Sequence, residues 1–327
     1  MRLLTGGVAH VAIKIEEDLL DRNMSLNKPH VRSLADLAAS ALVSKSANSY
    51  EWIAVLPRKC DKKSKERYIS RFLSNKLIKP IAVMNDFVPE LLAMSGRNGK
   101  TVILILDQSK ISDGFECLMV SLRTAERAIP IAWKVIETKG SIGFAEQKLL
   151  LDDVAKMVPE GIEILLTADR FYGTAALVEW CQTHQWQYRI RLKSNLILHH
   201  EGGEITTGDA ARNNLQLKDA YFNCSKIKTH IGVLHEEGHK EAWIIAMDCI
   251  PSKNKILDYG MRWGIECMFS DFKSRGFEIT KTHLKHADRI ERLILVLTIA
   301  LYWAVSTGMQ PNVNSSRIET KKKLTDL

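Results

Sequence analysis

The chain has 327 residues, enough for one large domain or two smaller ones. It is 46% hydrophobic and 26% charged, an ordinary globular composition that excludes a disordered chain, a collagen and a disulfide-stabilised miniprotein. Its 46 basic side chains exceed its 38 acidic ones, and the resulting net charge of +8 points weakly to an anionic partner such as nucleic acid.

The sequence predicts a soluble, cytoplasmic protein. The six cysteines include no Cys-x-x-Cys pair and are interpreted as scattered reduced thiols. Residues 1–15 lack the long apolar core of a signal peptide. The longest apolar run, 293–305, is interrupted only by Thr298 and is shorter than the roughly 20 residues that a membrane-spanning helix needs. We therefore expect a buried core helix there.

Residues 1–98 are expected to form a helical DNA-binding region. Residues 33–43 have apolar side chains at helical spacing, with Ser33 placed to cap a helix. The stretch 58–71 carries seven Lys or Arg residues against two acidic ones. Such a stretch is typical of a solvated helix face, and also of a face that contacts DNA phosphates. The turn-rich segment 95–100 marks the boundary.

Residues 99–194 have the pattern of a mixed α/β domain. The unbroken apolar runs 102–106 and 162–168 are typical of buried strands. Further strands are expected at 116–123, 129–136 and 186–192, and helices at 145–157 and 174–184. This order predicts an α/β fold with a sheet of mixed direction.

The pattern changes after residue 194. Residues 195–252 contain many glycines and short alternating runs, which predict a small β-rich insertion. Helical character returns in 253–309, and a polar tail, 310–327, ends the chain as given.

Two acidic residues follow the two buried runs of the α/β region. Asp107 comes directly after 102–106 and Asp169 directly after 162–168, so each is expected to end a strand. Adjacent strands lie about 4.8 Å apart, and if these two are neighbours their carboxylates can share a metal ion. An aspartate at the end of a strand is common for turn reasons alone, so neither residue by itself indicates a site.

A third element adds to the pair. Tyr259, Arg262, Glu266 and Lys273 fall in a segment of helical character, and at about 100° per residue they share a stripe about 60° wide. A salt-bridge row at the edge of the core could give the same pattern. Trp263 lies beside this stripe and is expected to pack.

The spacing Y-x2-R-x3-E-x6-K of these four residues resembles the signature of DDE transposases of the insertion-sequence-four family of bacterial mobile elements. The motifs Leu-Ile-Leu-Asp at 104–107 and Thr-Ala-Asp-Arg-Phe-Tyr-Gly at 167–173 resemble the family's two aspartate motifs, in the same order. The resemblance covers about residues 100–305. It implies a ribonuclease H-like core split by the insertion, and cut-and-paste transposition by hydrolysis at the element ends and strand transfer into target DNA.

The resemblance also implies the cofactor and the catalytic residues. Asp107, Asp169 and Glu266 would hold two Mg²⁺ ions, which Mn²⁺ can replace, with Asp107 bridging both. The chemistry of the residue types agrees, because Mg²⁺ prefers oxygen ligands and needs only one or two carboxylates per ion. The expected partner is double-stranded DNA, both the terminal repeats of the element and the target, bound by a dimer.

The remaining residues of the signature are expected to hold the DNA end. Tyr259, Arg262 and Lys273 cannot usefully ligate Mg²⁺ at neutral pH but can contact phosphate oxygens, and Arg170 could add a contact. A base extruded from the stack needs an aromatic face. Trp243 stands where some family members have a tryptophan in that role, although a tryptophan packed in the sheet would fit equally.

Three other functions remain open from the sequence. His235-Glu236-Glu237-Gly238-His239 satisfies the H-E-x-x-H pattern of zinc proteases, but that pattern needs a helix, and strand-like runs flank it here. A metal-dependent DNA endonuclease without strand transfer would use the same acidic residues. A catalytically silent DNA-binding derivative is the third alternative, and the presence of all three acidic residues argues against it.

Overall fold

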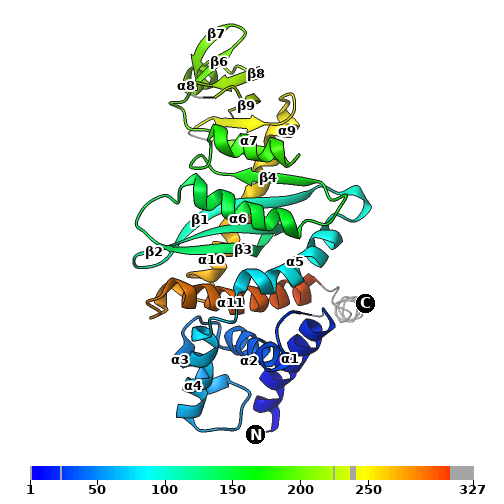
Figure 1. The fold of residues 1–327 in the computed structure, drawn as a ribbon, viewed down its shortest axis with the longest axis vertical. Helices are drawn as coiled ribbons and strands as arrows, with labels where there is room; N and C mark the ends of the chain where they lie inside the picture. Colours follow the sequence, from blue (N-terminus) through cyan, green and yellow to red (C-terminus); the bar gives the residue numbers. More distant parts are fainter. Residues whose placement is uncertain (1, 23, 224, 236–240, 310–327) are drawn as a thin grey trace, which may run out of the picture.

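The structure is a computed structural model that describes residues 2–22, 24–223, 225–235 and 241–309. Its elements follow one another as three tiers (Figure 1). A helical region lies at one end, a mixed sheet with its helices lies in the middle, and a β-rich end lies at the other. The fold is therefore mixed α/β with a helical region first, as the sequence predicts.

The helical region consists of five helices and a short 3₁₀ turn: α1 Arg2–Asp21, α2 Lys28–Ser44, α3 Ser49–Val55, α4 Lys62–Ser74, α5 Pro80–Ser95 and η1 Arg97–Gly99. Side-chain caps set several of the starts. Asn27 accepts a hydrogen bond from the His30 amide at the start of α2, and Asp61 accepts one from the Ser64 amide at the start of α4. Ser33 was expected to cap α2 but lies inside it, where its hydroxyl donates to the Pro29 carbonyl.

The middle tier begins with β1 Val102–Ser112, β2 Phe115–Thr124, β3 Arg127–Glu137, α6 Phe144–Met157, β4 Ile164–Ala168, α7 Ala175–Thr183 and β5 Gln187–Arg191. The strands expected from the apolar runs are all present. Strand β1 pairs antiparallel with β2 and parallel with β4, and β4 pairs parallel with β5. Strands β1 and β4 are thus direct neighbours in a sheet of mixed direction.

The β-rich stretch comprises β6 Ile197–His200, β7 Gly203–Thr206, α8 Thr207–Arg212, β8 Leu217–Phe222, β9 Lys228–Leu234 and β10 Trp243–Met247. Its strands continue the central sheet, because β10 pairs antiparallel with β5. The strand order across the ten-stranded sheet is β3-β2-β1-β4-β5-β10-β9-β8-β6-β7. Residues 195–252 therefore extend the sheet by way of β10.

The chain then returns to the middle tier through α9 Lys253–Leu257, η2 Asp258–Arg262, α10 Trp263–Phe272, η3 Ile279–Lys281 and α11 Ala287–Met309. Helix α11 lies between the sheet and the helical region (Figure 1). It contacts β3 of the sheet and α2, α4 and α5 of the helical region, and α5 also contacts β3. The Arg292 guanidinium, which is almost fully buried, donates to the Leu73 carbonyl at the end of α4.

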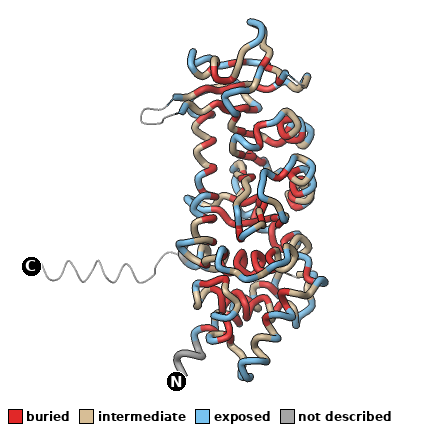
Figure 2. The backbone as a smooth tube through the Cα atoms, turned by 90° about the vertical axis from the view of Figure 1, so that its left-hand side faces the viewer, coloured by how far each residue is buried: buried red, intermediate tan, exposed pale blue. Residues whose placement is uncertain are grey.

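One hydrophobic core runs through the helical region and the sheet, with α11 at its centre. Figure 2 shows buried residues inside the helical region and the sheet, with exposed residues mainly in the loops at the surface. Within the described residues, one stretch, Ala287–Thr307, is long and apolar enough to cross a membrane, and 67% of that window is buried inside the fold. The apolar run 293–305 is therefore a core helix of this fold, as expected.

Candidate active site

Asp107 and Asp169 lie next to each other on the neighbouring strands β1 and β4. Leu106 pairs with Ala168 in the parallel register, so the two aspartates occupy the next position on each strand. Asp169 follows the end of β4 directly, as expected. Asp107 does not end its strand, because β1 continues to Ser112 in its pairing with β2, where Asp107 lies opposite Met119. The hairpin partner prolongs β1, and an apolar run cannot reveal this.

The signature segment is not one α-helix. Tyr259 and Arg262 lie in the 3₁₀ turn η2, Glu266 lies in α10, and Lys273 follows the last residue of α10. The stripe calculated for a continuous α-helix is therefore wrong in geometry, since a 3₁₀ turn advances by about 120° per residue. Contacts still bring part of the set together: the Arg262 guanidinium donates to Glu266 Oε1 at 2.7 Å, one helical turn later.

A cavity of about 520 Å³ brings the three acidic residues together. Its lining includes Asp107, Asp169 and Glu266 from three separate elements, and also Lys273. The Lys273 ammonium donates to the Ser109 hydroxyl on β1 at 2.6 Å, which fixes the end of α10 against that strand. The remaining lining residues are Gln108, Ser109, Ser141, Phe171, Phe269, Ser270 and Ser274.

Arg262 connects two of the acidic residues. Its guanidinium donates to Asp107 Oδ2 at 2.8 Å as well as to Glu266, and the Arg262 residue is only 8% exposed. The other Asp107 oxygen, Oδ1, accepts the Gln108 amide at 2.8 Å. Although burial opposes it, the nearby Tyr259, Asp107 and Glu266 hold the pKa of Arg262 above its ordinary value.

The carboxyl group of Asp107 is costly to ionise in the folded chain. Its pKa is raised to about 6: burial is the largest cause, Arg262 and the Gln108 amide oppose it, and repulsion from Asp169 and Glu266 adds to it. Burial also lowers the pKa of the Lys273 ammonium, against the effect of Glu116, Glu266 and Asp107. Perturbed pKa values of this kind cluster at functional sites.

The other predicted DNA contacts lie at the same edge of the sheet. Tyr259 is buried, and its ring packs edge-on against Trp243 with the centroids 5.1 Å apart. Trp243 begins β10 and is partly buried. Arg170 is exposed and does not line the acidic cavity. Its guanidinium pairs with Glu241 at 3.2 Å.

Sequence reasoning missed three features of this region. Glu241 pairs with Arg191 as well as Arg170, at 3.2 Å in each case. Trp263 was expected to pack but is 57% exposed, with the Arg262 guanidinium 5.9 Å from its ring centroid. Among the residues that the structure describes, the buried Tyr172 hydroxyl has no hydrogen-bond partner, and its pKa is raised by burial and by Asp107 and Asp169. Only Tyr172 had a sequence signal, its place in the second aspartate motif.

The donor set suits a divalent cation in its chemistry. Three carboxylates face one cavity, and carboxylate oxygens are the ligands that Mg²⁺ prefers. A cationic group, the Arg262 guanidinium, already bridges two of them. In the described ranges, no three His, Cys, Asp or Glu side chains are grouped closely enough to hold a metal ion as they stand. The cavity therefore contains carboxylates of the right chemistry for a divalent cation, but they are not grouped around one point, and the Arg262 guanidinium lies between two of them.

The H-E-x-x-H pattern falls mostly outside the described residues, since 236–240 are not described. The strands on either side, β9 and β10, pair antiparallel with Trp243 opposite Leu234. The flanks are thus strands, as expected for the interpretation that disfavours a zinc protease.

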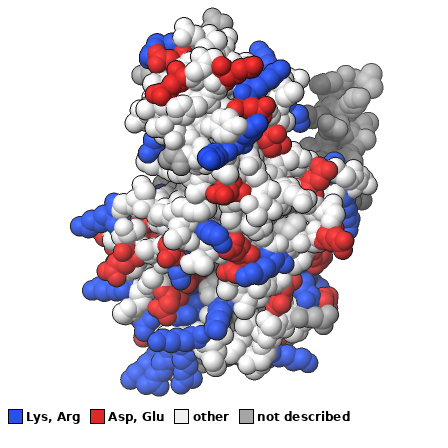
Figure 3. Space-filling view, turned by 45° about the horizontal axis from the view of Figure 1, so that its top comes forward, with Lys and Arg blue, Asp and Glu red and all other residues white. Residues whose placement is uncertain are grey.

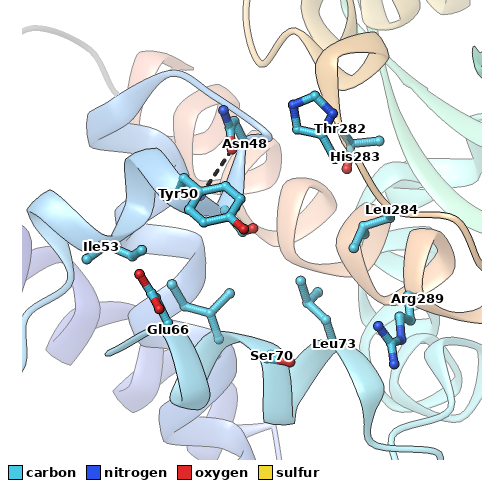
Figure 4. A pocket seen from close by; sticks show the side chains of 12 residues that line it. Asn48, Tyr50, Ile53, Glu66, Ser70, Leu73, Thr282, His283, Leu284 and Arg289 are labelled. Atoms are coloured by element: carbon cyan, nitrogen blue, oxygen red, sulfur yellow. Dashed lines mark hydrogen bonds between the residues drawn. The ribbon is translucent and has the colours of Figure 1, made fainter. Parts of the chain in front are cut away.

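A second cavity, of about 260 Å³, lies between the helical region and the segment that precedes α11. Figure 4 shows Tyr50 and Ser70 on the helical side, with His283 and Arg289 on the opposite side. Glu66 is its only acidic lining residue. None of the three acidic residues of the first cavity lines it, so the two cavities are separate.

An acidic cavity with cationic side chains, at an edge where two strands carry adjacent aspartates, is suited to phosphodiester chemistry. Residues 141–303, about half of the chain, match a family model described as a transposase DDE domain. This match supports a DDE transposase, an enzyme of the nuclease and transposase class with a ribonuclease H-like fold. The matched segment contains Asp169 and Glu266 and begins after Asp107. No curated protein matches the chain in sequence.

Proposed function

We propose that the chain is the transposase of an insertion sequence of the insertion-sequence-four family, acting by cut-and-paste transposition. It would hydrolyse phosphodiester bonds at the ends of the element and transfer the freed strands into target DNA. The observation that carries the proposal is the convergence of Asp107, Asp169 and Glu266 on one cavity beside Lys273. The family match supports the same class of enzyme from independent information.

In this proposal Asp107, Asp169 and Glu266 hold two Mg²⁺ ions, which Mn²⁺ can replace. When bound, such ions activate a water or hydroxyl nucleophile and stabilise the leaving oxygen. Asp107 is suited to bridging because it lies beside Asp169 on the sheet and faces Glu266 through Arg262.

The cationic side chains would bind the DNA end. Lys273 lines the acidic cavity and can reach a phosphate there. Arg170 is exposed near Asp169 and pairs with an exposed partner, Glu241, so a phosphate can compete for it. Tyr259 would hold a phosphate from beneath Trp243, and Trp243 would stack on an extruded base.

Residues 1–98 would be the main DNA-binding region, ahead of a catalytic core at 99–194 and 253–309 that is interrupted by the insertion 195–252. The support is the basic face of α4, where Lys62, Lys63 and Arg67 are exposed. Figure 3 shows Lys and Arg side chains gathered at the lower left, toward the helical end of the molecule. The protein would act in the bacterial cytoplasm as a dimer on DNA.

The test uses plasmid DNA that carries the gene with its natural flanks. Asp107→Asn, Asp169→Asn and Glu266→Gln should each lower Mg²⁺-dependent cleavage at the element ends by more than about a hundredfold, since even indirect supports of metal ligands cost 10–100-fold. The control is Asp113→Asn, which changes a fully exposed acidic residue paired with Lys110. Substantial cleavage by any one folded variant of the three would contradict the assignment.

The same reaction separates the proposal from its nearest alternative. A transposase yields joined products in which element ends are attached to target DNA, whereas an endonuclease without strand transfer yields cut ends alone. End binding without either product in the wild-type protein would favour a catalytically silent derivative.

A further inference from the structure

Two of the three proposed metal ligands, Asp107 and Glu266, both bind the positively charged guanidinium of Arg262. The Arg262 guanidinium donates to Asp107 Oδ2 at 2.8 Å and to Glu266 Oε1 at 2.7 Å. Its side chain is 10% exposed, against 16% for Asp107 and 48% for Glu266. A guanidinium does not lose its proton in a protein, so this is a permanent positive charge.

The guanidinium lies between the two carboxylates, where a divalent cation held by both would also have to lie. Asp107 Oδ2 accepts from Arg262, and Asp107 Oδ1 accepts from the Gln108 amide. A divalent cation beside the guanidinium would meet a like charge in a partly buried setting, where repulsion is poorly screened. The absence of any three grouped ligands over the described ranges agrees with this picture.

We propose that Arg262 occupies the place of a divalent cation between Asp107 and Glu266 in the DNA-free protein, so that the guanidinium bridge and cation binding exclude each other. This inference rests on the proposed function, which makes both carboxylates metal ligands. Arg262 is then a positioning residue before the cation arrives: its single positive charge offsets part of the negative charge of the acidic pair, and it holds the start of α10 against β1.

The exchange gives the displaced guanidinium a new partner. A planar guanidinium binds a phosphate through two parallel hydrogen bonds as well as it binds a carboxylate. A DNA phosphate that takes Arg262 away from Asp107 and Glu266 therefore frees both carboxylates for the cation. By linkage, DNA raises the affinity for the cation and the cation raises the affinity for DNA by the same factor. The protein would thus complete its metal site mainly at a DNA end.

The full chain is first treated with a chelator to remove bound metal ions. Mn²⁺ binding is then measured without DNA, from the electron paramagnetic resonance signal of the free Mn²⁺ that remains. Arg262→Gln removes the charge and keeps a hydrogen-bond donor, and it should tighten Mn²⁺ binding by about tenfold or more. Arg262→Lys keeps the charge but lacks the planar guanidinium, and its Mn²⁺ affinity should lie between those of the wild type and Arg262→Gln. The matched control is Arg191→Gln, whose partner Glu241 is not a proposed ligand and which should bind like the wild type.

A second measurement does not depend on the glutamine variant. In Arg262→Ala, millimolar guanidinium ion should weaken Mn²⁺ binding by refilling the space, whereas wild-type binding should not respond. Thermal unfolding of each variant confirms that the fold is retained.

The outcomes separate this inference from the proposed function. Mn²⁺ binding by folded Arg262→Gln that is equal to or weaker than wild type, while Asp107→Asn abolishes it, would keep the metal assignment and overturn the exchange. Tightening that survives the addition of Asp107→Asn would place the cation elsewhere and overturn both. Tightening that is lost with Asp107→Asn would support both.

Discussion

At the scale of single residues, the main feature of the acidic cavity is electrostatic: burial and the repulsion between its three carboxylates both oppose the ionisation of Asp107. The Asp107 side chain is only 16% exposed and lies near two other carboxylates, and one guanidinium offsets only part of the cost of its ionisation. The chain keeps a carboxyl group where a neutral residue would be more stable. A group retained at such a cost is expected to serve binding or catalysis rather than folding.

This conflict predicts a pH dependence of stability in the chelator-treated protein. The pKa of Asp107 is about 6 in the fold against an ordinary value of 3.8, so between these values the folded state holds a proton that the unfolded state has lost. The contribution of Asp107 is therefore favourable below about pH 4 and is lost as the pH rises through 6, by at most about 1.4 kcal/mol per pH unit.

Asp107→Asn removes this titration. Urea unfolding is measured from pH 4 to 8. The free energy of unfolding of the wild type should fall relative to that of the variant between about pH 4 and 6, and the difference should stay constant above that range. Parallel curves for the two proteins would show that Asp107 does not titrate there, and the argument from burial would be wrong.

Two tryptophans at the site give a second prediction. Trp243 packs on Tyr259, whereas Trp263 is largely exposed beside Arg262. If Trp243 stacks on an extruded base, Trp243→Ala should reduce end processing by about tenfold or more, since such stacking is worth roughly 1–3 kcal/mol, and should reduce end binding less. Fluorescence of 2-aminopurine at the end position reports the extrusion. Normal extrusion in Trp243→Ala together with its loss in Trp263→Ala would assign the stacking to Trp263 instead.

At the scale of elements, the position of α10 depends on a glycine. A Cβ atom added at Gly264 would lie 2.8 Å from the Arg127 carbonyl oxygen at the start of β3. Helix α10 therefore approaches β3 more closely than any side chain at 264 would permit. Two residues later in the same helix, Glu266 faces the cavity.

Gly264→Ala should push α10 away from β3 and displace Glu266. We expect a loss of stability of about 1–3 kcal/mol, typical of overpacking, and a fall in cleavage larger than that loss explains. Gly260→Ala is the matched control, because a Cβ there meets only the Trp243 ring, at an ordinary 3.5 Å. Thermal unfolding and cleavage are measured on both variants. Wild-type cleavage by Gly264→Ala would show that α10 can shift without affecting the site.

The helices and strands were largely predictable from the sequence, whereas the contacts between side chains of different elements were not. Apolar runs predicted strands β1 and β4, because a strand buried on both faces is apolar on both, and strand-like segments predicted β2, β3 and β5. The 3₁₀ turn η2 was missed because spacing arithmetic assumes one helical geometry throughout. The contact of Arg262 with Asp107 joins residues 155 positions apart, and no local pattern encodes it. The family signature identified these residues before the fold placed them together.

At the scale of the whole molecule, α11 joins the helical region to the sheet. It packs on β3 and on α2, α4 and α5, so the helical region and the sheet share one hydrophobic core. Residues 273–289, which lead into α11, border both the acidic cavity and the cavity of Figure 4. DNA held by the helical region would therefore be presented to the acidic cavity in a fixed relation.

This arrangement predicts that α4 contributes to DNA binding at a distance from the chemistry. Lys62, Lys63 and Arg67 are exposed, and no ion pair engages them in the part of the chain that the structure describes. Each phosphate contact contributes about 0.9 to the slope of log binding constant against log salt concentration. Changing all three to alanine should therefore lower that slope by up to about 2.7 units and weaken binding to all sequences alike.

The matched control changes three lysines that are already paired with carboxylates: Lys110, Lys148 and Lys156. It removes the same net charge, so a general effect of charge would lower the slope equally in both triple variants. Binding to a terminal DNA fragment is measured by fluorescence anisotropy between 50 and 200 mM salt, the range over which several phosphate contacts change affinity by orders of magnitude. A slope reduced only in the α4 variant assigns the contact to that helix, because the two proteins then differ in where the charge was lost. Equal slopes in the two triple variants would show that the basic face of α4 is a solvated surface. DNA binding would then be confined to the edge of the sheet.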